Sequence, residues 1–334
     1  MAELVSLDEV RAAAFRLRGV AVRTPLIPFP AGGPVDLKPE SLQPTGAFKL
    51  RGAYNAVYAV TRDLHSCAAP DGVVAHSSGN HGFAVAYAAR LLGIRAAIVV
   101  PENAPAVKTA AIESAGAELV RVEPTLAARI AATDEIARVR GYHPVAPFDD
   151  RDVIAGQGTV GLEIAEDLAA LPGRQSPAAV LVPVSGGGLI SGVAVAVKSL
   201  LPGTRVIGVE PELAADARDS LRAGTRVAWS SAQTARTSAD ALRVEQVGKL
   251  TFPHLQAYVD DIVTVSEEEI LGAVRRLARE ARLIAELGGA AAVAAALSRG
   301  PAELGLAAGH SGRIIAVVSG GNIDPALLAD ILRV

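Results

Sequence analysis

Lys49 is the residue of this sequence with the clearest capacity for covalent chemistry. It lies in residues 41–53 (SLQPTGAFKLRGA), directly after Phe48 and just inside the expected start of a helix. A lysine amine acts as a nucleophile or general base where its surroundings favour the neutral form. Most lysines in such places are solvated surface charges, so the stretch gains meaning only from the rest of the chain.

A glycine-rich loop much later in the chain has the makings of a phosphate site. Ser185, Gly186, Gly187 and Gly188 separate an expected strand from a helix that opens near Leu189. Consecutive glycines there let backbone N–H groups converge at the positive end of the helix. No Gly-Lys-Ser/Thr follows and the dinucleotide spacing is not clear, so neither fingerprint applies. Taken alone, the loop could equally be a tight structural turn.

Two further loops carry polar groups after expected strands. Residues 77–81 (SSGNH) offer hydroxyl, amide and imidazole groups at a helix start, suited to a carboxylate or a polar ring substituent. Residues 319–322 (SGGN) repeat this composition near the C-terminus. Each could be an ordinary helix cap. In a fold that brings strand ends together, all three loops favour a single anionic ligand with several polar groups.

The expected elements would place the loops together. Strands are expected at 35–38, 73–75, 96–100, 118–122, 180–184, 205–209, 261–265 and 313–318, and helices at 6–19, 45–60, 83–92, 106–115, 126–140, 159–170, 189–200, 266–287 and 290–298. This alternation implies an α/β fold with parallel sheets covered by helices. One sheet is expected from the strands between 73 and 122 and another from those beyond 180. Ligands of such folds bind at the C-terminal ends of strands, where all three loops lie.

Composition narrows the functional class. The formal net charge of the 334 residues is −3 and no Lys/Arg block stands out, which argues against nucleic-acid binding. The single cysteine, Cys67, excludes a disulfide framework and fits a reducing cytosol. The N-terminus lacks a signal-peptide core, and no apolar run is long enough to span a membrane. We therefore expect a cytoplasmic protein that binds neither membranes nor nucleic acid.

Five motifs occur in the order SLQPTGAFKLRGA, HSSGNHGFA, VIAGQGT, VPVSGGGL and VSGGN. In this ordered set the chain resembles the fold-type II pyridoxal phosphate (PLP) enzymes, close to the serine/threonine dehydratases (threonine ammonia-lyases) and serine racemases, from about residue 22 to 322. The resemblance implies two domains, each an open, mostly parallel sheet flanked by helices, as in the tryptophan synthase β-like fold. Residues 72–148 would form the small domain, and 1–71 with 149–334 the large, PLP-binding domain.

The resemblance also implies roles for individual residues. Lys49 would be the covalent anchor and general base, Phe48 would flank the PLP ring, and Asn80 would bind its phenolic oxygen. Ser319 would face the pyridine nitrogen. The phosphate would be cradled by the loop and the helix start after it, which comprise Ser185, Gly186, Gly187, Gly188 and Leu189. The substrate carboxylate would be held by Ser77, Ser78, Gly79, Asn80 and His81.

The resemblance also bears on which chemistry follows and on a possible cation. Ser78 matches the hydroxyl that handles the proton on the face opposite the lysine in racemases. Glu210 and Asp216 match carboxylates that, with the Ala214 carbonyl, hold a divalent cation in racemase-like members, and Mg²⁺ or Ca²⁺ would suit these oxygens. Solvated acids after a strand are the alternative interpretation. Ser185 stands where many relatives have glycine, which is compatible with binding through backbone N–H groups.

The expected activity is α,β-elimination, which converts L-threonine and/or L-serine to a 2-oxo acid and ammonia. Serine racemase and 3-hydroxyaspartate dehydratase are the alternatives, and a non-catalytic protein that binds a small ligand is an alternative of another class. The expected partners are a small amino-acid substrate and a second copy of the chain in a homodimer. No regulatory domain follows residue 334, so we expect no feedback inhibition by a branched-chain amino acid.

Overall fold

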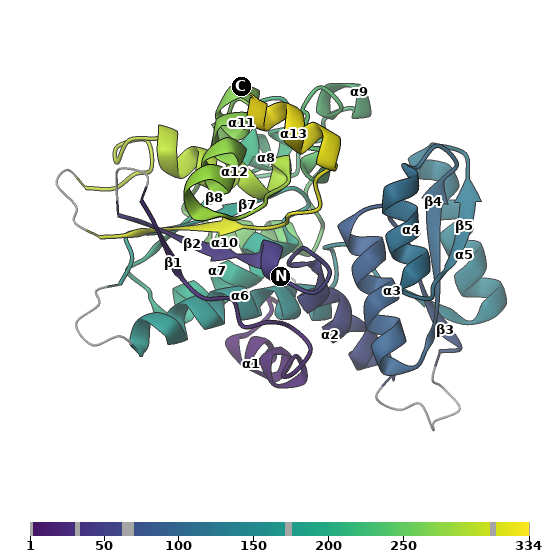
Figure 1. The fold of residues 1–334 in the computed structure, drawn as a ribbon. Helices are drawn as coiled ribbons and strands as arrows, with labels where there is room; N and C mark the ends of the chain where they lie inside the picture. The colour runs from purple at the N-terminus through teal and green to yellow at the C-terminus, as the bar shows by residue number, and fades with distance from the viewer. Residues whose placement is uncertain (1–2, 31–33, 62–69, 171–175, 308–311, 334) are drawn as a thin grey trace.

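The computed structural model describes residues 3–30, 34–61, 70–170, 176–307 and 312–333. Two sheets organise these residues, and helices cover both (Figure 1). The predicted α/β class with two mostly parallel sheets is confirmed. Among the described helices, none combines the length and the apolar character that crossing a membrane requires.

The six-stranded sheet, called the large sheet below, has the order β1-β2-β10-β7-β8-β9. Only β1 and β2 pair antiparallel, and the other neighbours are parallel. The strands are β1 (Ile27–Phe29), β2 (Val35–Pro39), β7 (Ala179–Pro183), β8 (Arg205–Pro211), β9 (Asp261–Val265) and β10 (Ile314–Val318). The expectation that this sheet forms only from strands beyond residue 180 was wrong, because β10 pairs with β2 and so draws the N-terminal strands into it.

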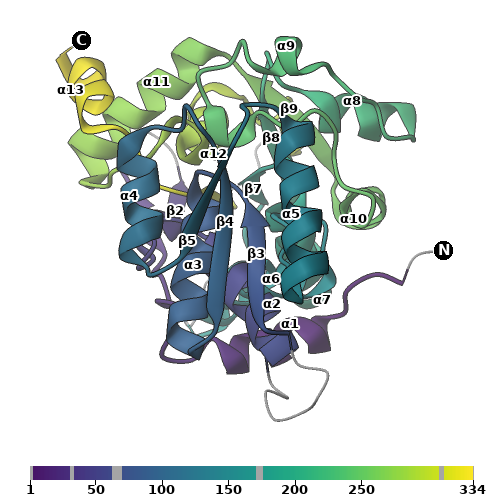
Figure 2. The ribbon, with the colours of Figure 1, turned by 90° about the vertical axis from the view of Figure 1, so that its right-hand side faces the viewer.

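The four-stranded sheet, called the small sheet, is parallel throughout and has the order β5-β4-β3-β6. Its strands are β3 (Gly72–His76), β4 (Arg95–Pro101), β5 (Glu118–Val122) and β6 (Tyr142–Pro144). Figure 2 shows this sheet in front, with α3 (Asn80–Leu92) and α4 (Ala106–Ser114) on one side and α5 (Leu126–Arg140) on the other. All four of its strands come from residues 72–144.

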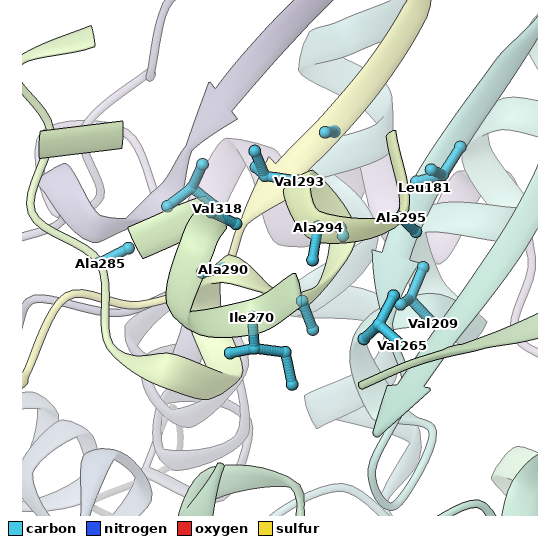
Figure 3. Close-up of a cluster of buried hydrophobic side chains, with 14 of the residues drawn as sticks. Leu181, Val209, Val265, Ile270, Ala285, Ala290, Val293, Ala294, Ala295 and Val318 are labelled. Carbon is cyan, nitrogen blue, oxygen red and sulfur yellow. The ribbon is translucent and has the colours of Figure 1, made fainter. Parts of the chain in front are cut away.

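Helices of the large sheet form two layers. One layer contains α6 (Arg151–Ala169), α7 (Gly188–Leu200) and α10 (Thr251–Tyr258), whose apolar side chains pack on one face. The other face is covered by α11 (Glu267–Arg276), which continues as a π-helix over Leu277–Ala281, and by α12 (Leu287–Ser298). Figure 3 shows α12 lying on the sheet through Ala290, Val293 and Ala294. Its alanines let the helix backbone approach the strands closely.

The remaining helices complete the chain. They are α1 (Leu7–Arg16), η1 (Glu40–Leu42), α2 (Lys49–Thr61), α8 (Asp216–Ala223), α9 (Ser231–Thr234), η2 (Asp240–Leu242) and α13 (Pro325–Arg333). Of these, α2 contacts both α3 and α6, and it lies between the two sheets in Figure 1. A capping box starts α11, with the Ser266 Oγ accepting from the Glu269 N–H. The helix that it starts ends at Ala281 instead of 287.

Two helix starts differ from prediction for identifiable reasons. Helix α2 begins at Lys49 rather than 45, because Ala47 forms a bridge with Gly320 and the Phe48 N–H donates to the Ser319 carbonyl. Helix α6 begins at Arg151 rather than 159, capped by the Asp150 carboxylate. Strands β1 and β6 and helices α10 and α13 were not predicted.

Candidate active site

Lys49 is the first residue of α2, and two contacts fix its amine. The Nζ donates a hydrogen bond to the Pro147 carbonyl oxygen at 2.7 Å and lies 5.0 Å from the centre of the Phe48 ring. The side chain is half-buried. Burial lowers the pKa of Lys49 to about 8, against the opposing effect of the Glu286 carboxylate. A lysine with this pKa is partly neutral near pH 7, which a nucleophile or general base requires.

The phosphate loop, residues 185–188, runs from β7 into α7. Gly187 has a φ of +90°, and an added Cβ would lie 2.9 Å from the Thr251 Oγ. A Cβ on Gly186 would lie 2.3 Å from the Phe148 ring, and one on Gly188 would lie 2.9 Å from the Phe148 Cβ. The first-turn N–H groups of a helix have no intrahelical acceptor, and at α7 no side chain of the N-cap residue Gly187 caps them. These N–H groups are suited to an anion.

Ser185 begins this loop in an uncommon conformation. Its φ of 54° is in the left-handed region, which glycine adopts without strain. The Ser185 Oγ donates to the Ala241 carbonyl oxygen at 3.2 Å. This hydrogen bond from the side chain to the backbone accompanies a left-handed backbone conformation that glycine would adopt with less strain.

The loop at the end of β3, residues 77–81, leads directly into α3. The N-cap residue of α3 is Gly79, which has no side chain to cap the helix. The Ser77 Oγ accepts from the Gly79 N–H at 3.3 Å. Ser78 is half-buried beside them. His81 is buried, with its Nε2 2.9 Å from the Val145 carbonyl oxygen. Burial, with the nearby Lys49 charge, lowers the pKa of His81 to about 3, so this imidazole is neutral at ordinary pH.

Asn80 connects this loop to the large-sheet part of the chain. Its Nδ2 donates to the Glu286 Oε1 at 2.6 Å, and its Oδ1 accepts from the Asn322 Nδ2 at 2.8 Å. Glu286 is 8% exposed, and its N–H donates to the Gly320 carbonyl oxygen. Sequence reasoning missed Glu286 and the Pro147 carbonyl. Neither has a local signal, because each joins the site through contacts between distant segments.

Ser319 follows β10, and its backbone binds Phe48, the residue before Lys49. Its carbonyl oxygen accepts from the Phe48 N–H at 3.0 Å, and its N–H donates to the Gly289 carbonyl oxygen at 3.3 Å. The residue is buried.

Direct contacts therefore link all four predicted segments. The Phe48 N–H joins the lysine stretch to Ser319, Asn80 joins the 77–81 loop to Asn322, and residues 147–148 join Lys49 to the phosphate loop. The structure thus brings the lysine and the three loops together, as the strand-end argument predicted. The ligand contacts of each residue stay predictions.

Of the carboxylates predicted to bind a cation, Glu210 lies near the end of β8 and Asp216 is the first residue of α8. The buried Glu210 accepts from the Ala217 and Arg218 N–H groups at 3.2 and 2.8 Å. Asp216 is also buried, and neither of its carboxylate oxygens has a hydrogen-bond partner among the described residues. Burial raises the pKa of Asp216 to about 7, and burial with the Asp216 charge raises the pKa of Glu210 well above its usual range. Across the described residues, no three His, Cys, Asp or Glu side chains cluster as a metal site.

Three known proteins illustrate what the chain is similar to. It is 39% identical to an L-threonine ammonia-lyase of Thermotoga maritima, over 99% of this chain and 79% of the relative. It is 38% identical to the L-threo-3-hydroxyaspartate ammonia-lyase of Saccharomyces cerevisiae, over 88% of this chain and 84% of the relative. The solved structure of maize serine racemase has a TM-score of 0.89 at 34% identity, and the match covers 99% and 98% of the two chains.

A model of a protein family also matches most of the chain. The model for pyridoxal-phosphate dependent enzymes matches residues 17–320, which include Lys49, the loops at 77–81 and 185–188, and the first two residues of the loop at 319–322. The protein with Lys49 at the start of α2 and a glycine cradle at the start of α7 belongs to the pyridoxal-phosphate dependent enzyme family.

Proposed function

We propose that this protein is a PLP-dependent ammonia-lyase that converts L-threonine and/or L-serine to a 2-oxo acid and ammonia. The observation that carries the proposal is a half-buried lysine amine with a pKa of about 8, joined through residues 147–148 to the glycine-rich loop at the start of α7. The names of the similar ammonia-lyases support the same reaction class.

The residues present fit the cofactor. The glycines at 186–188 carry no Cβ, so Phe148 and Thr251 can pack closely against the loop, and the first-turn N–H groups of α7 would hold the phosphate. Lys49 would anchor PLP, Phe48 would lie beside its ring, and Asn80 would bind its phenolic oxygen. When bound, PLP supplies the electron sink for the charge left at the substrate α-carbon. Ser319 would offer the ring nitrogen a neutral hydroxyl in place of a carboxylate.

Proton handling falls to the chain itself. The Lys49 amine, freed when the substrate amine takes its place, would accept the α-proton, and its lowered pKa keeps part of it neutral near pH 7. The 77–81 loop would hold the substrate carboxylate through its hydroxyl and N–H groups. His81, neutral and turned to the Val145 carbonyl, would add no cationic charge to this loop.

The test is product formation from defined substrates. Purified protein with PLP should form 2-oxobutyrate from L-threonine or pyruvate from L-serine, and Lys49→Ala should abolish both products and the visible absorbance of the lysine-bound cofactor. Lys249→Ala is the matched control: it removes an exposed side chain, keeps the backbone N–H and should keep both. PLP binding without either product would refute the substrate assignment. Lack of lysine-dependent absorbance would favour a non-catalytic binding protein.

Serine racemase and 3-hydroxyaspartate dehydratase are second candidates. Ser78 favours the racemase, because its loop opens α3 beside Asn80 and a hydroxyl there could serve the face opposite Lys49. Chiral analysis of serine after incubation separates racemisation from elimination, and oxaloacetate formation reports on 3-hydroxyaspartate. A Ser78→Ala variant that keeps full racemase activity would exclude the two-base interpretation.

A bound Mg²⁺ or Ca²⁺ is a further part of the proposal. Asp216 has two buried carboxylate oxygens without described hydrogen-bond partners, and an ion held by Glu210, Asp216 and the Ala214 carbonyl would satisfy them. The ion should raise the thermal unfolding midpoint of the wild type and not of Asp216→Asn. An equal increase in both proteins would place the binding elsewhere.

Assembly, location and domain division complete the proposal. We expect a cytoplasmic homodimer whose small domain is residues 72–148 and whose large domain is 1–71 with 149–334. The separate strand sets of the two sheets support this division. Sedimentation equilibrium tests the dimer, and limited proteolysis near residues 71 and 148 tests the boundaries.

A further inference from the structure

The carbonyl group of Gly186 is bound by two donors from outside the phosphate loop. Its oxygen accepts from the Thr251 Oγ at 2.7 Å and from the Gly248 N–H at 3.2 Å. Thr251 is fully buried at the start of α10. A carbonyl oxygen that turned into the cradle would repel a phosphate, so these two bonds favour the conformation that presents only N–H groups.

Asp149 fixes the segment that supplies those donors. Its Oδ2 accepts from the Lys249 N–H at 2.9 Å, and its Oδ1 accepts from the Leu250 and Thr251 N–H groups at 2.7 and 3.3 Å. Leu250, the N-cap of α10, makes no side-chain cap of its own. A carboxylate about one hundred residues earlier in the chain therefore caps this helix, with bonds strengthened by its charge and by the helix dipole.

The two residues before Asp149 contact the rest of the site. The Phe148 ring and backbone fill the space beside Gly186 and Gly188, where a Cβ would collide. The Pro147 carbonyl oxygen accepts the hydrogen bond from the Lys49 Nζ. Three consecutive residues thus contact the lysine, the phosphate loop and the helix start behind that loop.

From these contacts we propose that residues 147–149 and Thr251 form a brace that holds the phosphate loop in its anion-binding conformation. Asp149 and Thr251 are positioning residues in this brace, since they act on the phosphate through Gly186 and do not touch it. The inference rests on the proposed PLP binding. It adds that phosphate affinity depends on a hydroxyl and a carboxylate outside the glycine motif.

A comparison of PLP with pyridoxal, which lacks the phosphate, isolates this role. Thr251→Val removes the hydroxyl and nearly keeps the side-chain volume, so the dissociation constant for PLP should rise about three- to tenfold while that for pyridoxal stays unchanged. Thr251→Ser keeps the hydroxyl and should restore PLP affinity. Both constants are measured by absorbance titration of cofactor-free protein, with circular dichroism to confirm folding.

A second pair of variants tests the carboxylate. Asp149→Asn loses the charge that serves three N–H groups and should weaken PLP about tenfold, again sparing pyridoxal. Asp150→Asn is the matched control, because the neighbouring Asp150 caps α6 through the Val153 N–H at 2.9 Å. It should leave the ratio of PLP to pyridoxal affinity unchanged.

The outcomes separate this inference from the function on which it rests. Variants at 149 and 251 that weaken PLP and pyridoxal equally, or weaken neither, would overturn the brace while wild-type PLP binding stands. A wild-type protein that binds no PLP would overturn the proposed function and the brace with it.

Discussion

The pKa of Lys49 gives a quantitative test of the site without any cofactor. Burial lowers this pKa from the usual 10.5 to about 8. At pH 7 a lysine with a pKa of about 8 is neutral in about 9% of molecules, against about 0.03% at a pKa of 10.5, a ratio of about 300. Only the neutral amine is acylated. Lys49 should therefore be modified near neutral pH, with a labelling midpoint near pH 8.

Glu286→Gln is the perturbation that tests the cause. The Glu286 carboxylate raises the pKa of Lys49 against the larger effect of burial. His81, the other titratable group close enough to interact, stays neutral across this range. Removing the carboxylate charge should lower the Lys49 midpoint, and a decrease of about one pKa unit would raise the neutral fraction at pH 7 about fivefold.

The assay is trace acetylation of cofactor-free protein between pH 6 and 10, followed by mass spectrometry of the peptides. Lys249, which is exposed, serves as the internal reference. Glu280→Gln is the matched control, because Glu280 is an exposed carboxylate paired with Arg276. A wild-type midpoint near 10.5 would refute the burial argument. Equal shifts in the Gln variants at 286 and 280 would refute the role of the local charge.

Three stability predictions can be checked by urea denaturation. Gly192→Ala on α7 should lower the free energy of unfolding by about 3 kcal/mol, since its Cβ would lie 2.2 Å from a carbonyl oxygen of α6, whereas Gly272→Ala on the open face of α11 should raise it by about 0.5–1 kcal/mol. Similar changes in the free energy of unfolding for Gly192→Ala and Gly272→Ala would contradict the packing argument. Arg282 has a φ of 59°, so Arg282→Gly should raise the free energy of unfolding by about 1 kcal/mol. A decrease would mean that the Arg282 side chain stabilises the fold by more than this strain. Glu40→Gln should lower the free energy of unfolding by about 3–5 kcal/mol, because it leaves the buried Arg51 charge without one of its two carboxylate partners. A neutral result would show that Glu163, which also accepts from the Arg51 guanidinium, compensates that charge alone.

Elements with strong local signals were the ones that the sequence located well. The strands Glu118–Val122 and Asp261–Val265 and the helix Leu126–Arg140 have the predicted bounds. The start of α6 was missed because VIAGQGT contains two glycines, which disfavour a helix by propensity. In the fold these glycines are needed: a Cβ on Gly156 would lie 2.5 Å from a backbone oxygen of α2. Tertiary packing thus overrides the local preference.

The site likewise contains residues that local sequence signals predict and residues that they do not. Lys49 and the glycine loops were predictable, because strand ends of parallel sheets meet and glycine-rich sequence marks close backbone approach. Glu286 and Pro147 were not, because their contacts with Asn80 and Lys49 span about two hundred and one hundred residues of chain. A helix start such as that of α10, capped from Asp149, has no signal in its own sequence.

The opposing influences on Lys49 explain how one residue could serve both as anchor and as base. Burial alone would lower its pKa, and a base whose pKa falls far below the working pH accepts protons weakly. The Glu286 charge opposes that fall, and the Pro147 carbonyl holds the amine by a hydrogen bond that it can make in either protonation state. A general base is most effective with a pKa near the operating pH, and a value of about 8 meets that condition. Glu286 would therefore matter to proton transfer although it lies outside every motif that the sequence displayed.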